Sequence, residues 1–112
     1  MRLFEMEQED HYKNLLKRLC EAQGISSRKP RFENIEDLVI IHVKNHLKEG
    51  VDLECFKILN IIHQTVAPLR IEFKQQLYMY PGGGRLDRVA VVFEKEDYMT
   101  LNKKLENGDV GK

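Results

Sequence analysis

Hydrophobic residues recur at three- and four-residue spacing in three segments, which is the spacing of one face of an α-helix. The first segment, Glu5–Gln23, ends at Gly24, a residue that commonly follows a helix. The second, Leu53–Val66, begins after Asp52, a residue type that caps helix N-termini. The third is Lys95–Glu106. The pattern predicts helices near the start, in the middle and towards the end of the chain.

Two later segments have the pattern of β-strands. Residues of Leu69–Met79 are apolar at nearly every second position, which predicts a strand with one buried face. Leu86–Glu94 contains a run that is apolar on both faces, as in a central strand. A turn signal, Pro81–Gly84, separates the two segments and predicts a hairpin. We expect Leu77 to face Val89, because a slip of one residue would bury a charge.

The segment Ile35–Leu47 can be interpreted in two ways. As a helix it would begin after Asn34, a good N-terminal cap. As a strand, Leu38–Val43 is a short apolar run rich in β-branched residues, which is typical of a strand buried on both faces. We favour the strand and place it beside Val89–Phe93. The helix alternative would give a winged-helix-like protein of three helices and a hairpin, with DNA as its ligand.

These elements predict an α+β protein with a ferredoxin-like, split βαβ arrangement in two layers. We expect a single domain over residues 1–112. Within it, residues 1–31 would form the N-terminal helix and a basic loop, and residues 32–108 the α/β core.

The composition excludes several classes of protein. The 112 residues carry 18 basic and 18 acidic side chains, so the net charge is zero, unlike a strongly basic nucleic-acid protein. The longest apolar run, Leu38–Ile41, is far shorter than the ~20 residues of a membrane helix. The first residues show no apolar signal-peptide core, and Cys20 and Cys55 lack a metal-type spacing. We therefore expect a cytoplasmic protein with two reduced, buried thiols.

The chain resembles RNA-recognition-motif domains over about residues 38–108. Ile41–Asn45 is similar to the first signature strand of that family, with His42 where the family has an aromatic residue. Val89–Glu94 is similar to the second signature strand, although Ala90 replaces a stacking aromatic residue. The resemblance implies a ferredoxin-like fold and RNA binding, and it calls for a fourth strand after the last helix, which this chain lacks.

The predicted sheet gives one candidate binding face. The strand registers place six polar or charged side chains on the side away from the helices, where we count a positive excess of three against Glu72. These residues are His42, Lys44, Arg70, Lys74, Tyr78 and Arg88. A basic loop, Arg28, Lys29 and Arg31, would extend the face. The face could stack bases and hold phosphates, but we favour protein binding because the aromatic platform is thin.

No residue pattern indicates catalysis. His42 and His46 would share a metal site only on a helix, so we expect no metal, no cofactor and no enzyme, although one sequence leaves open a site assembled only in space. The expected function is a small non-catalytic interaction module. We expect a homodimer, because Leu38–Val43 would otherwise be an exposed apolar edge that Arg2–Met6 or the N-terminal helix would have to cover. The alternative functions are an RNA- or single-stranded nucleic-acid-binding module and the winged-helix-like protein.

Overall fold

The computed structural model describes residues 10–25, 30–47, 49–50, 52–82 and 84–106. Three α-helices, one 3₁₀ turn and four strands lie in this part of the chain. In chain order they are α2 His11–Ala22, β1 Arg31–Ile35, β2 Leu38–Lys44, α3 Leu53–Val66, the 3₁₀ turn η1 Ala67–Leu69, β3 Lys74–Met79, β4 Leu86–Glu94 and α4 Lys95–Glu106. The expected N-terminal part of the first helix, residues 5–9, lies outside the described residues, as do Arg2–Met6.

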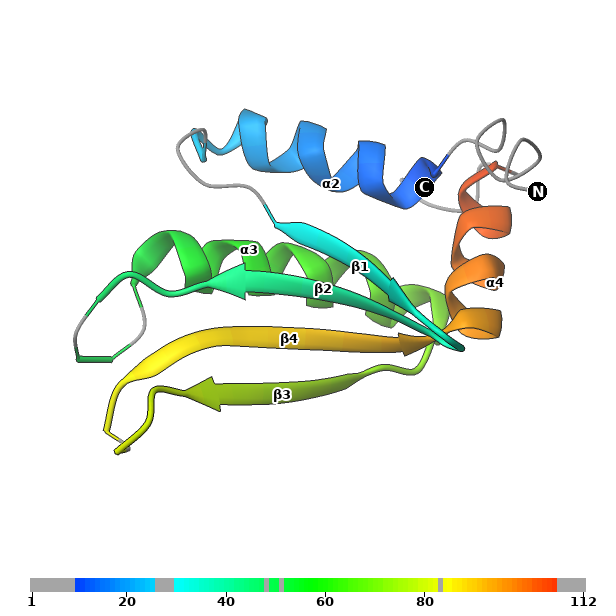
Figure 1. The fold of residues 1–112 in the computed structure, drawn as a ribbon. Coiled ribbons are helices and arrows are strands. Elements are labelled where there is room, and N and C mark those ends of the chain that lie inside the picture. The colour runs from blue at the N-terminus through cyan, green and yellow to red at the C-terminus, as the bar shows by residue number, and fades with distance from the viewer. Residues whose placement is uncertain (1–9, 26–29, 48, 51, 83, 107–112) are drawn as a thin grey trace.

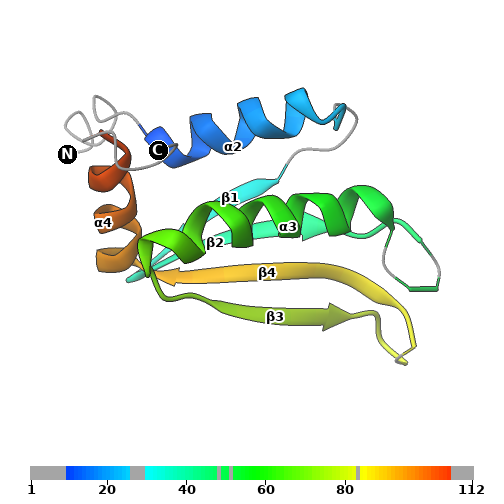
Figure 2. The same ribbon diagram turned by 180° about the vertical axis from the view of Figure 1, so that it is seen from behind.

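The four strands form one antiparallel sheet in the order β1-β2-β4-β3. Strand β4 therefore lies between the two strands that α3 connects, which is the split βαβ arrangement. Helix α3 covers one face of the sheet, α2 runs alongside β1, and α4 stands at the end of β4 (Figures 1 and 2). The protein is thus an α+β fold in two layers. Figure 1 shows no described helix in front of the opposite face of the sheet, which we call the open face.

One hydrophobic core joins α2 to the rest of the molecule. Tyr12 and Leu16 of α2 are fully buried in the same cluster as Phe93 of β4. The Tyr12 hydroxyl lies 2.7 Å from the Thr65 hydroxyl, and the Tyr98 hydroxyl donates to the Asp10 carboxylate over 2.6 Å. Because its apolar stripe fills the shared core, the N-terminal helix is part of the fold and not an appendage.

The segment Arg31–Ile35 corrects the sequence prediction. It was expected to belong partly to a basic loop, but it forms strand β1 and pairs with β2 through a hairpin turn at Glu36. This pairing makes Leu38–Lys44 an inner strand, so the exposed edge on which the expected homodimer depended does not exist. The strand over Leu38–Lys44 also excludes the winged-helix alternative.

Strand β3 begins later than the pattern predicted. After Pro68 the chain makes the 3₁₀ turn η1 and reverses at Arg70, whose φ of 61° lies in the left-handed region. Pairing therefore starts at Lys74, and Arg70 lies outside the sheet. The predicted register is confirmed, since Leu77 lies opposite Val89. A register shift between Tyr78 and Met79 then leaves an extra residue, Asp87, in β4.

Candidate functional site

Strand pairing fixes which side chains lie on the open face. Residues paired across the sheet share a face, and the residues of the helix side fill the core. The open face therefore carries Arg31, Glu33, Ile35, Leu38, Ile40, His42, Lys44, Lys74, Gln76, Tyr78, Arg88, Ala90, Val92 and Glu94. Five of the six predicted face residues are among them, and Arg70 is not.

A polar chain crosses the middle of this face from β1 to β3. Glu33 Oε1 lies 2.6 Å from His42 Nε2, and Arg88 Nε donates to His42 Nδ1 over 3.0 Å. The Arg88 guanidinium lies 4.2 Å from the centroid of the Tyr78 ring. A guanidinium nitrogen only donates, so Nδ1 accepts and the ring proton lies on Nε2, where it donates to Glu33. Both ring nitrogens of His42 are thereby engaged by side chains of neighbouring strands.

This arrangement changes the expected role of His42. Its exposed fraction is 6%, and its neighbour Ala90 is fully buried. A base could stack on the ring only after Glu33 and Arg88 had moved away. The position that the RNA-recognition-motif resemblance assigns to stacking is therefore filled by a structural contact, and the centre of the open face offers no aromatic platform.

Asp87, the extra residue in β4, holds two of the predicted basic residues. Its carboxylate accepts hydrogen bonds from Lys44 and from Arg88, each over 2.8 Å. The bond from Lys44 lowers the pKa of the Asp87 carboxyl below its ordinary value of 3.8, and the same bond raises the pKa of Lys44. Four residues of the face are positive, namely Arg31, Lys44, Lys74 and Arg88, and three are negative, namely Glu33, Asp87 and Glu94. The positive excess on the face therefore falls from the predicted three to one.

Charge is nevertheless separated along the open face. At the hairpin end of β3 and β4, Arg85 lies 4.5 Å from the Tyr80 ring and Lys44 lies 6.0 Å from it. We call this group the basic end; it consists of Lys44, Tyr78, Tyr80, Arg85, Asp87 and Arg88. Arg85 Nε is buried and has no hydrogen-bond partner among the described residues. Lys44 lies six positions after Leu38 in β2, about 20 Å along the strand.

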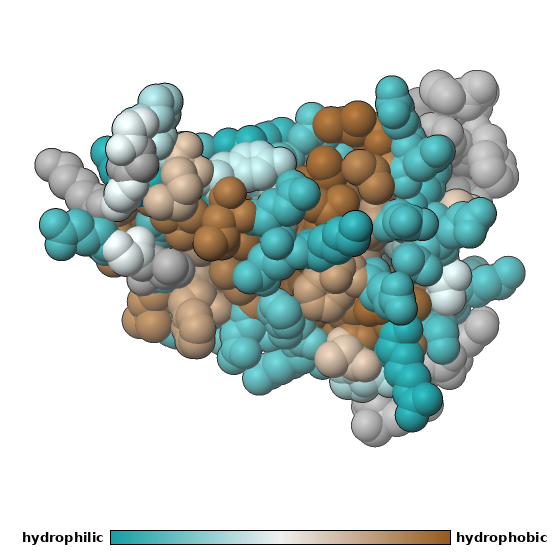
Figure 3. Space-filling model, turned by 90° about the horizontal axis from the view of Figure 1, so that it is seen from below, coloured by the Kyte–Doolittle hydropathy of each residue, from teal (hydrophilic) through white to brown (hydrophobic). Residues whose placement is uncertain are grey.

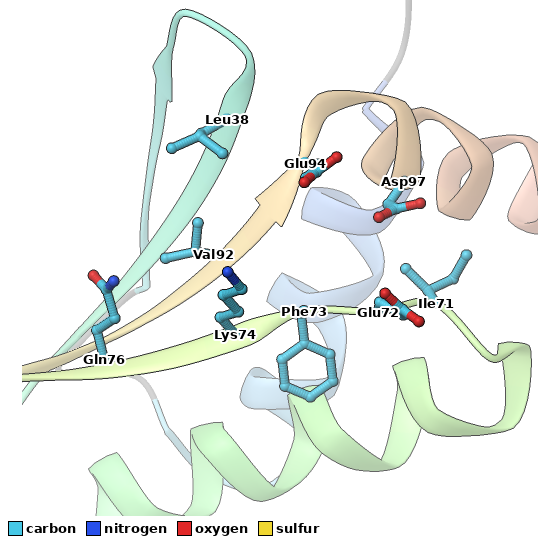
Figure 4. Close-up of a pocket in the computed structure, with 9 residues that line it drawn as sticks. All are labelled: Leu38, Ile71, Glu72, Phe73, Lys74, Gln76, Val92, Glu94 and Asp97. Atoms are coloured by element: carbon cyan, nitrogen blue, oxygen red, sulfur yellow. The ribbon is translucent and has the colours of Figure 1, made fainter.

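The opposite end carries carboxylates around an apolar floor. A solvent-open groove of about 570 Å³ lies where β4 runs into α4, and we call it the acidic groove. It is lined by Leu38, Ile71, Glu72, Phe73, Lys74, Gln76, Val92, Glu94 and Asp97. Figure 4 shows the Phe73 ring pointing towards α3, whereas Leu38 and Val92 lie on the other side of the sheet. Three carboxylates thus face one ammonium group, that of Lys74.

The remaining predicted residues are dispersed. Arg31 is exposed at the start of β1, Lys74 lines the acidic groove, and Arg28 and Lys29 lie outside the described residues. The acidic partners on the face were not predicted from the sequence. Glu33 was missed because β1 was not recognised, and Asp87 because a regular register has no extra residue. The alternation of β4 could have placed Glu94 on the open face, because Glu94 lies two positions after Val92.

The described residues contain no group of three or more His, Cys, Asp or Glu side chains that could hold a metal ion. His42 lies in strand β2, whereas His46 lies in the loop after it. Both cysteines are buried, as predicted. None of the described helices is long and apolar enough to cross a membrane.

No family model matches the chain, and neither a curated protein nor a solved structure matches it. The resemblance to RNA-recognition motifs stays a prediction from residues alone.

Proposed function

We propose that this chain is a small non-catalytic protein-binding module whose acidic groove holds an apolar segment of a partner protein flanked by basic residues. The observation that carries the proposal is the combination of an apolar floor and a carboxylate rim on a sheet face that no described helix covers. Leu38 is 36% exposed and Val92 is half-buried, so both can contact an incoming aliphatic side chain. Glu94 and Asp97 stand beside them.

The charges of the groove favour a basic protein segment over a nucleic acid. Phosphates would meet Glu72, Glu94 and Asp97 at this end, and like charges at an interface are unfavourable. At the other end, Lys44 and Arg88 already pair with Asp87. A partner Lys or Arg, in contrast, would gain a carboxylate on entering the groove. We therefore propose protein binding, and the test includes a nucleic-acid probe so that nucleic-acid binding would be detected.

Three labelled probes separate these functions by fluorescence anisotropy. The first is a short peptide with two Leu residues flanked by Lys and Arg, the second replaces each Lys and Arg by Glu, and the third is an oligouridylate. We expect binding of the basic peptide alone. The double variant Glu94→Lys, Asp97→Lys should weaken that binding at least about tenfold. Glu106→Lys, one substitution of the same kind at the exposed far end of α4, is the control and should leave it unchanged.

Two results would contradict the proposal. One is equal binding of the basic peptide by the double variant and by the Glu106→Lys control. The other is preferential binding of the oligouridylate with a steep loss of affinity as salt is raised, because phosphate contacts release counterions.

A further inference from the structure

Among the described residues, no strand pairs with the outer edge of β3. This strand pairs with β4 on one side and is the last strand in the order β1-β2-β4-β3. Exposed edges are usually protected by charges, prolines or a covering element. Strand β3 contains no proline and one charge, Lys74, and its Leu77 and Met79 are 62% and 48% exposed. Strand β3 therefore has few of the features that usually prevent an edge strand from pairing with another chain.

The apolar surface of this edge continues onto α3. His63 of α3 lies 2.9 Å from the Gln75 side chain and 4.9 Å from the centroid of the Phe73 ring, which sets α3 against β3. The two elements run in opposite directions (Figure 2). Phe56, two helical turns before His63 and 59% exposed, therefore points to the same side of the molecule as Leu77. Figure 3 shows the side formed by β3, with hydrophobic side chains on its left, where α3 begins and β3 ends, and others across its centre and right.

We propose that a second copy of this chain occupies the edge, with β3 pairing antiparallel to its own copy about a two-fold axis at Leu77. The two four-stranded sheets would then form one sheet of eight strands. A two-fold axis perpendicular to the sheet keeps the open faces of both copies on the same side. An open-face residue of one β3 must therefore pair with an open-face residue of the other, and a helix-side residue with a helix-side residue. Centring on Leu77 sets the two Leu77 side chains opposite each other on the helix side, flanked by both Phe56 rings.

Charge complementarity identifies the second copy as the occupant. The two-fold axis reverses the direction of β3, so the acidic groove of one copy comes beside the basic end of the other. In this register Lys74 lies opposite Tyr80 of the second copy. Glu72, two residues earlier, lies opposite Gly82 of the second copy, so its carboxylate comes towards Arg85, whose guanidinium stacks on Tyr80.

This inference goes beyond the proposed function. Glu72 lines the groove as well as the edge, so the two proposals are told apart by residues that they do not share: Glu94 and Asp97 for the groove, and Leu77 and Arg85 for the edge. Loss of peptide binding in the groove variant with retained dimerisation, or the reverse, therefore distinguishes failure of one proposal from failure of the other.

Sedimentation equilibrium over about 1 to 200 μM chain tests the pairing. We expect the wild-type mass to rise with concentration towards twice the 13.2 kDa of one chain. Leu77→Lys should remain at the mass of one chain. Met99→Lys removes a comparably exposed hydrophobic side chain, 57% exposed on α4, and should dimerise as the wild type does. Circular dichroism melts of both variants confirm that each is folded.

A charge swap tests the register. Glu72→Arg and Arg85→Glu should each raise the dimer Kd at least about tenfold, and the double variant should restore it. A wild-type chain that keeps the mass of a monomer throughout overturns the proposal, as does a dimer that Leu77→Lys leaves intact. A dimer that Leu77→Lys breaks but the double variant fails to restore overturns the two-fold arrangement at Leu77.

Discussion

The side chain of Asn45 holds the connection between β2 and α3. It is 1% exposed, and its amide donates to the carbonyl groups of Gly50 and Leu86, each over 3.0 Å. Its oxygen accepts from the backbone N–H of Asp52 over 2.7 Å. Asp52 in turn caps α3 by accepting from the N–H of Cys55. Asn45, which the sequence offered as part of an RNA-binding signature, therefore has a structural role in this fold.

Removing this amide should destabilise the protein. Asn45→Ala removes the side-chain partner of two buried backbone groups, the N–H of Asp52 and the carbonyl of Leu86, and we expect a loss of about 1–3 kcal/mol per unsatisfied group in the free energy of unfolding. Urea melts give the value. Asn60→Ala, on the exposed side of α3, is the control and should stay within about 0.5 kcal/mol of the wild type. Equal midpoints for the two variants would contradict the role given to Asn45.

Asp87 makes a pH-dependent contribution to stability. Its pKa is lowered in the folded state, first by the hydrogen bond from Lys44, so its contribution is present above 3.8 and is lost as the pH falls through the lowered value. Asp87→Asn should therefore lower the urea midpoint at pH 7, and the difference from wild type should shrink as the pH falls below 3.8 and through the lowered pKa of Asp87. A difference in urea midpoint that is the same at pH 7 and at acidic pH would show that the charge of Asp87 is not the cause of the lost stability.

At the scale of elements, strong periodic patterns predicted the structure and local turns did not. The helices over Leu53–Val66 and Lys95–Glu106 and the strand Leu86–Glu94 have the expected bounds, because each combines a clear apolar face with a cap or a turn. Strand β1 was missed because its turn at Glu36 lacks the Asn or Gly that usually marks a tight hairpin. That single omission also misplaced the free edge of the sheet.

The turn at Glu36 carries a testable strain. Its φ of 50° is a left-handed conformation, which is costly for residues with a Cβ and most costly for β-branched ones. Glu36→Val should therefore be less stable than Glu36→Gly, by about 1–3 kcal/mol, in thermal or urea melts. Glu33→Val and Glu33→Gly, compared in the same way inside β1, should show no such left-handed penalty. A Val variant as stable as the Gly variant would mean that this turn adopts another conformation.

At the scale of the whole molecule, α2 belongs to the single core. Leu16→Ala removes a side chain that is 1% exposed and should cost about 2–5 kcal/mol. Because α2, α3 and the sheet share one cluster, circular dichroism should show one transition that moves to lower temperature as a whole. Lys17→Ala, next to it and exposed, should leave the melt nearly unchanged. A separate early transition in the Leu16 variant would mean that α2 unfolds independently.

The candidate site was predictable only in part, because charge on a surface depends on which side chains meet in space. The alternation of β2 and β4 placed His42, Lys44 and Arg88 on one face, as observed. Periodicity carries no information on diagonal contacts such as Glu33–His42, or on a register shift that exposes Asp87 to Lys44. These contacts convert a predicted basic face into one with a basic end and an acidic groove.

Backbone amide chemical shifts in a ¹H–¹⁵N NMR titration test the proposed binding function most directly. On addition of the basic Leu-containing peptide, we predict that the largest shifts fall on Leu38, Val92, Glu94 and Asp97, which line the acidic groove. The amides of Lys44 and Arg88, at the opposite end of the face, should change little. Shifts centred on those two residues, or no shifts with the peptide and clear shifts with the oligouridylate, would contradict protein binding in the acidic groove.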